Sequence, residues 1–513
     1  MFKDKELMKN TALLTASSLA MRFVGMVWQV WLAGRIGETG IGLFQLIMSV
    51  VSLAVTLAVS GIRFTTTRLV SEELGRGKDG CVRAAVRRCM VYGAVFGLAA
   101  CAALLLVAER AGFLWLGDAR SVVPLRAAAL GLPFLAVSTV IYGYFTATGR
   151  VWKSVCVQIG RELFMIAVTA ALLAGYVRGD IESACRCIAL GGTLADAAAC
   201  AGIVLVLLAD MKKHLPGRCT ASSDGMTDRM LTIALPLAAA SYARSGLSTF
   251  QHLLVPQGLR RSGLNAAAAL SAYGVIQGMS LPAVLFPSCL MMALAELIVP
   301  KLTRAQIGGD GHEIQRVTAD ILHKSLLFSL GTAFCFLALG DGFGEALYGS
   351  EEAGKYIMLF ALIVPVMYMD MIADGCLKGL GEMMFCMYVN IADAGLSALL
   401  VWLMLPHGGI AAYVCVICFT EAFNFAVSLW RLRRTTAMRI RLLPIVRALA
   451  QAGLSAAAAR AVYCIALTKT NAGSCVPALV CAVVFYVLVY GLLISPGEAA
   501  GKRASGKRQS QCW

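Results

Sequence analysis

The amino-acid sequence alternates between long apolar runs and short polar stretches. About 14 of the runs approach the ~20 residues that a helix needs to cross a lipid bilayer, so we predict about 14 membrane-spanning helices. The fourth and eighth runs are long enough to tilt or kink, and Pro282 and Pro287 favour a kink in the eighth. The longest polar gaps, about 63–88 and 210–229, are predicted loops. The predicted spans are 10–34, 41–62, 89–108, 122–147, 159–177, 184–209, 230–256, 269–299, 322–341, 355–377, 385–405, 409–430, 445–467 and 475–494.

The composition agrees with a membrane protein and excludes two other classes. Apolar residues make up 59% of the 513 residues and charged residues 14%, and the mean hydropathy is +0.76. An average soluble domain is about 45–50% apolar and about 25% charged, and a disordered chain is poorer still in apolar residues. The predicted spans take up more than half of the chain and leave no space for a large soluble domain. We therefore predict an all-α polytopic membrane protein.

Lysine and arginine residues set the predicted orientation. The formal net charge is +16, and the basic residues lie between the apolar runs. With the N-terminus in the cytoplasm, roughly 32 of them fall on the cytoplasmic side and about ten on the other, as the positive-inside rule requires. We predict a multi-pass protein of the cytoplasmic membrane with both termini in the cytoplasm. The same distribution argues against a nucleic-acid partner.

The cysteine and histidine residues do not form a recognisable metal or redox motif. The 18 cysteines are spread along the chain, and most lie in apolar stretches, where a thiol behaves as a small hydrophobe. No disulfide framework follows from their spacing. Cys415 and Cys418 have C-x-x-C spacing, but within an apolar helix, and the five histidines do not cluster. We expect no metal site and no cofactor.

Two segments of the chain repeat one pattern of proline and glycine. In the fourth span, glycine follows Pro133 after 10 and 16 residues, and in the tenth span it follows Pro365 at the same two distances. Corresponding positions are 232 residues apart. Both segments therefore look like copies of one helix in an internally duplicated chain.

A second pair of segments supports the duplication. Arg22 precedes Gln29 in the first span, and Arg244 precedes Gln251 in the seventh, by seven residues each. Seven residues is close to two helical turns, so each arginine shares a face with its glutamine. The order predicts two parallel six-helix lobes plus two C-terminal helices, and parallel repeats of this kind hold a substrate site between them. The predicted parts are 1–215, 226–435, 445–494 and a basic cytoplasmic tail, 495–513.

Three stretches of the chain resemble a known family. They are GIGLFQ at 40–45, GIRFTTTRLVSEE at 61–73 and GYFTATG at 143–149. Together they are similar to the stage V sporulation protein B group of the superfamily of multidrug, oligosaccharidyl-lipid and polysaccharide (MOP) exporters, which also contains the lipid II flippases. The similarity covers nearly the whole chain, including the arrangement of six, six and two helices.

The resemblance implies a V-shaped transporter of two lobes that alternates between inward-open and outward-open states around a central cavity. The cargo it implies is a polyprenyl-diphosphate-linked sugar, such as a peptidoglycan precursor for the cell wall or the spore cortex. Flippases of this kind have cationic residues in helix one that face the cavity, and Arg22 matches the first of these. Where many relatives have another basic residue two turns later, this chain has Trp28 and Gln29, which lowers the local positive charge.

Arg22 and Arg244 are the leading candidates for substrate contact. A charge at mid-membrane costs about 2.5–3.5 kcal/mol on insertion scales unless it is paired or hydrated. Two guanidinium groups can bind a diphosphate, and Gln29 and Gln251 can donate to sugar or phosphate oxygens. Arg63, where span two meets the cytoplasm, can meet the head group at the entrance. The alternatives are an acid partner in the same lobe or snorkelling for the first two arginines, and positive-inside anchoring for Arg63.

Asp370 and Asp374 are the candidates for ion coupling. They share a face of span ten at i and i+4, and repulsion between two neighbouring carboxylates favours uptake of H⁺ or Na⁺. The alternative is a structural pairing with an arginine. Asp196 and His252 stand more alone in their spans, and a lone intramembrane histidine is typical of hydrogen-bonded structure. A further polar set in spans eleven and twelve consists of Asn390, Asp393, Glu421 and Asn424.

Three functions compete at this point. The first is a flippase for an anionic lipid-linked glycan, acting among membrane lipids as a monomer. The second is a cation-coupled multidrug or toxin exporter of the same superfamily, which would use acids in its cavity and which the two arginines argue against. The third is a membrane-embedded glycan polymerase or ligase, but the predicted outer loops are short and no H-E-x-x-H or Walker A motif is present. We therefore expect a transporter and no enzyme, driven by an ion gradient or by supply and consumption of its cargo.

Overall fold

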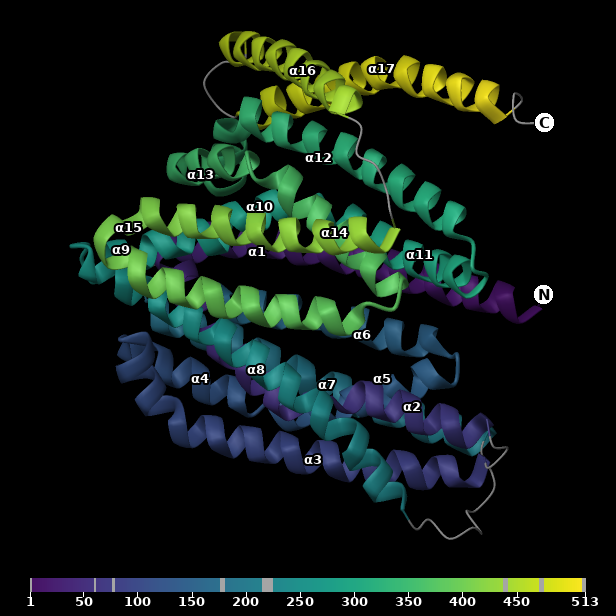
Figure 1. Ribbon diagram of the computed structural model, residues 1–513. Helices are drawn as coiled ribbons and strands as arrows, with labels where there is room; N and C mark the ends of the chain where they lie inside the picture. The colour runs from purple at the N-terminus through teal and green to yellow at the C-terminus, as the bar shows by residue number, and fades with distance from the viewer. Residues whose placement is uncertain are drawn as a thin grey trace. The chain divides into compact units, whose positions relative to one another are not determined.

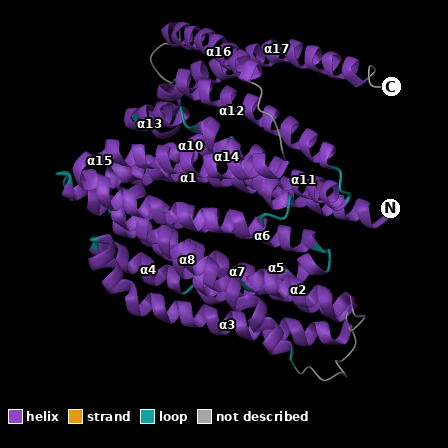
Figure 2. Ribbon diagram, viewed as in Figure 1, coloured by secondary structure: helices purple, strands orange, loops and turns teal. Residues whose placement is uncertain are grey.

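Helices make up the whole of the regular structure in the described part of the chain. The computed structural model describes residues 2–59, 61–75, 79–175, 180–214, 225–436, 442–469 and 475–509. Over these ranges there is no strand (Figures 1 and 2). The α-helices are α1 (Phe2–Val59), α2 (Ile62–Gly75), α3 (Asp79–Arg110), α4 (Val122–Ala129), α5 (Leu132–Ala147), α6 (Val151–Ala174), α7 (Ile181–His214), α8 (Met226–Arg261), α9 (Ala266–Tyr273), α10 (Leu281–Leu285), α11 (Ser288–Ile307), α12 (Gly311–Tyr348), α13 (Glu351–Ala361), α14 (Val364–Gly379), α15 (Met383–Thr436), α16 (Leu442–Lys469) and α17 (Val476–Gln509). Short π- and 3₁₀-helical turns are η1 (Ala111–Leu116), η2 (Ala119–Ser121) and η3 (Gly274–Ser280).

Many of these helices can cross a membrane. Within the described ranges, nine are long and apolar enough, and the number reaches eleven if each of two bent pairs is one span. The longest two, α1 and α15, are interrupted by glycines with non-helical backbone angles, Gly37 (φ 72°, ψ 178°) and Gly409 (φ 56°, ψ −138°). Each of them therefore accounts for two of the predicted spans. Every predicted span overlaps a helix or a bent pair, but α8, which contains the predicted span 230–256, is not among the helices long and apolar enough to cross a membrane. The all-α polytopic fold is confirmed.

The two bent pairs are the two segments that repeat in the sequence. Helix α4 with its preceding turn meets α5 at 43°, and α13 meets α14 at 58°. Pro133 and Pro365 lie in the first turn of α5 and α14, where a missing N–H is tolerated but the preceding helix cannot continue. Sixteen residues later, Gly149 and Gly381 have φ values of 72° and 78°, which glycine adopts without strain. Positions 232 residues apart therefore have the same local structure.

A matching tertiary contact accompanies each bent pair. The Thr67 hydroxyl on α2 donates to the Gly143 carbonyl of α5 at 3.1 Å, and the Thr303 hydroxyl on α11 donates to the Gly379 carbonyl of α14 at 2.8 Å. In both cases the threonine and glycine are 76 residues apart. A similar helix-to-helix contact thus occurs in each copy of the repeat, about one helical turn further along in the second copy.

Helix α2 corrects the prediction that 63–88 is a loop. Its residues Ile62, Leu69 and Val70 are buried, at the i, i+7 and i+8 spacing of one helical face. The segment is too polar to form a span of its own, which is why the apolar-run pattern missed it. The kink predicted in the eighth span is present, because Phe286 and Pro287 form a turn between α10 and α11.

Contacts group the helices into two compact units. Unit 1 comprises residues 1–28, 35–274 and 394–413, and unit 2 comprises 29–34, 275–393 and 414–513. The division thus places α8 with the helices that precede it, whereas the repeat assigns it to the second six-helix lobe. The boundaries 1–215, 226–435, 445–494 and 495–513 stay a prediction.

Each unit has its own apolar core. In unit 1, α2, α3, α5 and α7 bury a common cluster that includes Val70, Val86, Phe145 and Ile203. In unit 2, α12, α16 and α17 pack through small and aromatic residues, and the Tyr486 hydroxyl donates to the Gly331 carbonyl at 2.7 Å. The described cysteines are free thiols apart from Cys81, which is disulfide-bonded.

Candidate functional site

The two predicted substrate-binding arginines are both exposed cations of unit 1. Arg22 lies on α1 and Arg244 on α8. Neither has an ion-pair or hydrogen-bond partner among the residues whose side chains the structure describes. Next to Arg244, Ser245 contacts the Thr56 hydroxyl at 3.1 Å, and Thr249 donates to the Ser49 carbonyl at 3.0 Å. These contacts hold the middle of α8 against the second half of α1.

The other predicted cavity residues differ in whether their side chains already form hydrogen bonds. The Gln29 amide donates to the Gly278 carbonyl at 2.8 Å within unit 2. Gln251 is half-buried and its side chain has no hydrogen-bond partner in the described part of the chain. Arg63 is exposed on the first turn of α2, directly after the break at Gly61 (φ 69°). Gln251 therefore offers a donor that Gln29 offers only after its present bond breaks.

An ion pair in unit 1 corrects the expectation that Asp196 stands alone. Arg161 Nε on α6 lies 2.6 Å from Asp196 Oδ1 on α7, and Arg161 also contacts Glu162 at 2.7 Å. The pair neutralises one charge of each sign between two spans. His252 also has a partner, since its Nδ1 lies 3.1 Å from the Tyr273 hydroxyl. Both are structural contacts of the kind that buried polar groups require.

Unit 2 contains a group of acids that has no arginine partner within the described ranges. Asp370 lies on α14, and Asp393 and Glu421 lie on α15, close enough to interact electrostatically. Asn424 donates to Asp370 Oδ2 at 3.3 Å. Asp370 Oδ1 and Asp393 Oδ1 are buried and have no hydrogen-bond partner within the described ranges. Buried carboxylate oxygens without donors are costly.

The internal repeat shows how this group differs between the two copies. The positions 232 residues before Asp370 and Asp393 hold Ser138 and Arg161. A hydroxyl and a guanidinium in the first copy thus correspond to two carboxyls in the second. In the first copy, the charges of Arg161 and Asp196 cancel each other. In the second copy, the corresponding region contains an excess of carboxyl groups.

The two predicted ion-coupling acids, Asp370 and Asp374, have different partners. Lys378 Nζ lies 2.6 Å from Asp374 Oδ2, one turn along α14. Asp374 therefore has a counter-ion, whereas Asp370 faces α15. Among the described residues, no three His, Cys, Asp or Glu side chains are placed to hold a metal ion.

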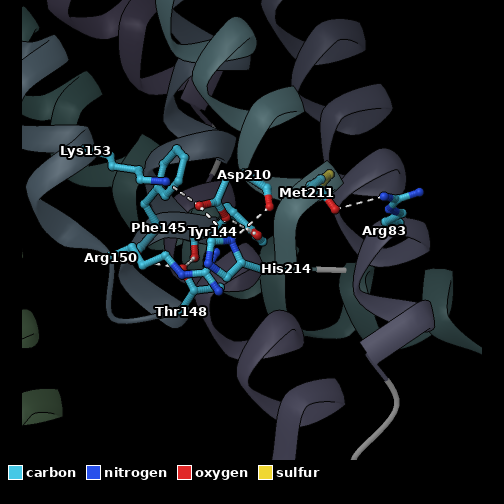
Figure 3. A network of polar contacts seen from close by, with 9 residues as sticks. All are labelled: Arg83, Tyr144, Phe145, Thr148, Arg150, Lys153, Asp210, Met211 and His214. Carbon is cyan, nitrogen blue, oxygen red and sulfur yellow. Dashed lines mark hydrogen bonds and ion pairs between the residues drawn. The ribbon is translucent and has the colours of Figure 1, made fainter. Parts of the chain in front are cut away.

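Sequence reasoning missed a polar network in unit 1, at the turn between α5 and α6 (Figure 3). The carboxylate of Asp210, on α7, is fully buried and forms ion pairs with Arg150 and Lys153. The Tyr144 hydroxyl donates to Asp210 Oδ2 at 2.8 Å, and His214 Nδ1 lies 3.5 Å from Oδ1. One buried acid thus ties the α5–α6 turn to the end of α7. The only signal in the sequence was Tyr144 within the GYFTATG stretch.

The corresponding turn of unit 2 has an ion pair of opposite polarity. Arg431 Nη2, near the end of α15, lies 2.7 Å from Glu382 Oε1 in the turn between α14 and α15. Glu382 is 232 residues after Arg150, and each follows its left-handed glycine directly. Both copies therefore fix this turn with an ion pair, but the acid and the base have changed places.

Comparison with known proteins places the chain in a family. The model of the family described as polysaccharide biosynthesis protein matches residues 7–306, more than half of the 513 residues. The chain belongs to the polysaccharide biosynthesis protein family. The family match contains Arg22, Arg63 and Arg244, whereas Asp370 lies beyond it.

Relatives of this polysaccharide biosynthesis family member include two sporulation proteins of Bacillus subtilis (strain 168). Stage V sporulation protein B is 23% identical over 69% of this chain and 69% of its own length. Sporulation protein YkvU is 19% identical over 75% of this chain and 84% of its own length. The resemblance inferred from the sequence is confirmed.

Solved structures show that the family member has the fold of MOP-superfamily transporters. The lipid II flippase MurJ, in an inward closed conformation, matches with a TM-score of 0.67 and 12% identity over 95% of this chain and 99% of MurJ. An inward-facing multidrug resistance MATE family transporter matches with a TM-score of 0.64 and 12% identity over 82% of this chain and 98% of its own. At such identities the likeness concerns the fold alone.

Proposed function

We propose that this protein is a flippase that moves a polyprenyl-diphosphate-linked sugar, a precursor of peptidoglycan or another envelope polysaccharide, across the cytoplasmic membrane by alternating access. The observation that carries the proposal is that Arg22 and Arg244, in the predicted spans 10–34 and 230–256, are both exposed and have no partner in the described part of the chain. A cation at that depth is costly unless it is hydrated or binds an anion. A diphosphate supplies both the charge and the paired acceptors that guanidinium groups bind.

The remaining candidate residues have distinct parts in the proposed cycle. Arg63, at the predicted cytoplasmic end, would receive the head group, and Gln251 would donate to a sugar or phosphate oxygen. Gln29 would join only when it leaves the Gly278 carbonyl. The polyprenyl tail stays in the bilayer while the polar head crosses. Cargo shifts the balance between the two states only through its different affinity for each.

The acids of unit 2 support proton coupling as the energy source. Asp370, Asp393 and Glu421 lie near one another without an arginine, and two of their oxygens have no donor among the described residues. Uptake of a proton removes repulsion within the group, and its release restores it. Asp370 is the main site in this proposal, because Asp374 already pairs with Lys378.

A cation-coupled multidrug exporter is the second candidate, and the same acids favour it. MATE family transporters share the fold, and three half-buried carboxyls suit a cationic drug better than a diphosphate. Arg22 and Arg244 oppose it, because both repel a cation. The two candidates therefore differ in which group contacts cargo, the arginines of unit 1 or the acids of unit 2.

The proposed function predicts that this protein speeds the crossing of a lipid-linked head group. In cells that lack the gene and its redundant partners, head groups at the outer leaflet should fall, and expression of this protein should restore them. The measurement is labelling of head groups by a reagent that does not cross the membrane. The same cells are exposed to cationic dyes. Unchanged labelling together with raised dye resistance would replace the flippase by the exporter.

Coupling through Asp370 gives a second prediction. Asp370→Asn mimics the protonated carboxyl, so we expect transport driven by a pH gradient to fall about tenfold or more, the loss that accompanies removal of one proton-transfer group. Asp374→Asn, one turn away, is the matched control and should retain transport. The assay is gradient-driven uptake in proteoliposomes. Equal losses in both variants would contradict a special place for Asp370, and transport on a sodium gradient alone would assign the coupling to Na⁺.

A further inference from the structure

The first turns of α8 lie against α2 and α3 within unit 1 (Figure 1). We name residues 226–235 the α8 entry segment. Arg229 Nη2 in this segment lies 3.0 Å from Glu73 Oε1 and Nη1 lies 3.4 Å from Glu72 Oε2, both on α2. Glu73 is only 2% exposed. One guanidinium therefore bridges two neighbouring acids, one of them buried.

Two methionines complete the contact of the entry segment. Met230 packs in a cluster with Ile62, Leu69 and Cys89, and its sulfur lies 3.9 Å from Cys89 Sγ. Met226 packs with Ala85 of α3 in a second, smaller cluster. Thioether side chains are flexible and fit several surfaces, so a contact built on methionine can separate and form again at small cost.

The backbone allows the entry segment to move separately from the rest of α8. Pro236 lies inside the helix directly after the segment. Pro236 has no N–H to donate to the Thr232 carbonyl, and its ring crowds the preceding turn. The helix therefore bends most easily at this point. Beyond Pro236, the contacts of Ser245 and Thr249 with α1 hold the middle of the helix in place.

The position of α8 in the repeat gives this contact a function. By the repeat, α8 is the first helix of the second half, while α2 and α3 belong to the first half. Alternating access requires the two halves to separate on each face in turn. A contact between halves at the predicted cytoplasmic ends must therefore break whenever that face opens.

We propose that the α8 entry segment is a latch that closes the cytoplasmic side of the transporter. Arg229 with Glu72 and Glu73 is its polar part, Met226 and Met230 are its apolar part, and Pro236 is its hinge. The latch rests on the proposed function only in requiring an alternating-access cycle, whatever the cargo. Charged groups regain water when the latch opens, so the ion pairs select the closed position without making it permanent.

Cysteine labelling tests the latch without any transport assay. Cys89 is fully buried beneath Met230, so N-ethylmaleimide should modify it slowly in the wild-type protein in membranes. Arg229→Glu should raise the labelling rate about tenfold or more, because it places a third acid beside a buried carboxylate. Adding Glu73→Arg to Arg229→Glu should restore slow labelling. Arg87→Glu is the matched control, because Arg87 is an exposed cation on α3. Cys101, on the same helix, is the internal standard for labelling. Equal Cys89 labelling in wild type and Arg229→Glu would overturn the latch.

A cross-link distinguishes a latch from a permanent structural contact. In Met230→Cys, a short thiol-to-thiol reagent should join position 230 to native Cys89 and stop transport, while Met230→Cys with Cys89→Ser should keep transport after the same treatment. Full transport by the cross-linked protein would show that the contact never opens and would contradict the proposal. If the wild-type protein moves no lipid-linked head group, the proposed cargo fails, and the labelling of Cys89 still decides the latch.

Discussion

Replacing both Arg22 and Arg244 by alanine should reduce transport of the lipid-linked head group to background. Arg22 on α1 and Arg244 on α8 are exposed cations, and a hydrogen bond to a charged group contributes about 1.5–3 kcal/mol. Each single substitution should therefore lower transport by about ten- to a hundredfold at limiting cargo. The double variant loses both contacts with the diphosphate. Complementation in cells lacking redundant flippases is the direct measurement.

The lysine variants separate charge from shape in this prediction. Arg22→Lys with Arg244→Lys keeps both positive charges but loses the paired donors of the guanidinium, so partial transport should return. Arg126→Ala is the control, because Arg126 forms an exposed ion pair with Glu109 far from both arginines in sequence. Full activity in a well-expressed double alanine variant would end the anionic head-group proposal.

The largest effect on stability is expected from Asp210→Asn. Its carboxylate is fully buried and pairs with Arg150 and Lys153 (Figure 3). Asparagine retains an acceptor for Tyr144 but leaves two cations without their counter-ion. Breaking a buried pair costs about 3–5 kcal/mol, and we expect roughly 3 kcal/mol here because both cations keep partial contact with water. The loss should appear as a lower midpoint of thermal unfolding in detergent.

Glu109→Gln provides the comparison for this stability prediction. It removes the acid from the ion pair between Glu109 and Arg126, which are 2.6 Å apart. The side chains of Arg126 and Glu109 are 48% and 65% exposed. Exposed pairs contribute about 0–1 kcal/mol, so this variant should unfold close to wild type. An Asp210→Asn protein as stable as Glu109→Gln would show that the network in Figure 3 does not fix the α5–α6 turn.

The sequence predicted the membrane-spanning helices well because the bilayer imposes a simple rule. A span must be apolar over about 20 residues, so runs of apolar residues coincide with helices from α1 to α17. Pro282 and Pro287 correctly predicted the kink of the eighth span, since proline acts on its own backbone. Pro133 and Pro365 served only to mark the repeat, and the structure shows that each begins the second helix of a bent pair. Helix α2 was missed because it is held by a narrow apolar face and not by a continuous apolar run.

The polar partners could not be predicted in the same way. Arg161 and Asp196 are 35 residues apart in sequence, and Tyr144 and Asp210 are 66 apart. Pairing over such distances depends on how helices pack, which the apolar pattern does not encode. Arg22 and Arg244 could be selected as candidate substrate residues without knowing how the helices pack, because the cost of an isolated charge in a membrane is a property of one helix. Their role remains a proposal.

The reversed ion pairs at the two turns have a consequence for how the chain assembles. Arg150 pairs with Asp210 in one copy and Glu382 pairs with Arg431 in the other. In a duplicated chain, a mispaired product would place a helix hairpin of one copy in the position of the corresponding hairpin of the other. Such an exchange would bring Arg150 against Arg431 and Glu382 against Asp210, and like charges in a partly dry setting repel strongly. The opposite polarity of the two ion pairs therefore favours packing of each hairpin within its own copy and disfavours mispaired or domain-swapped products.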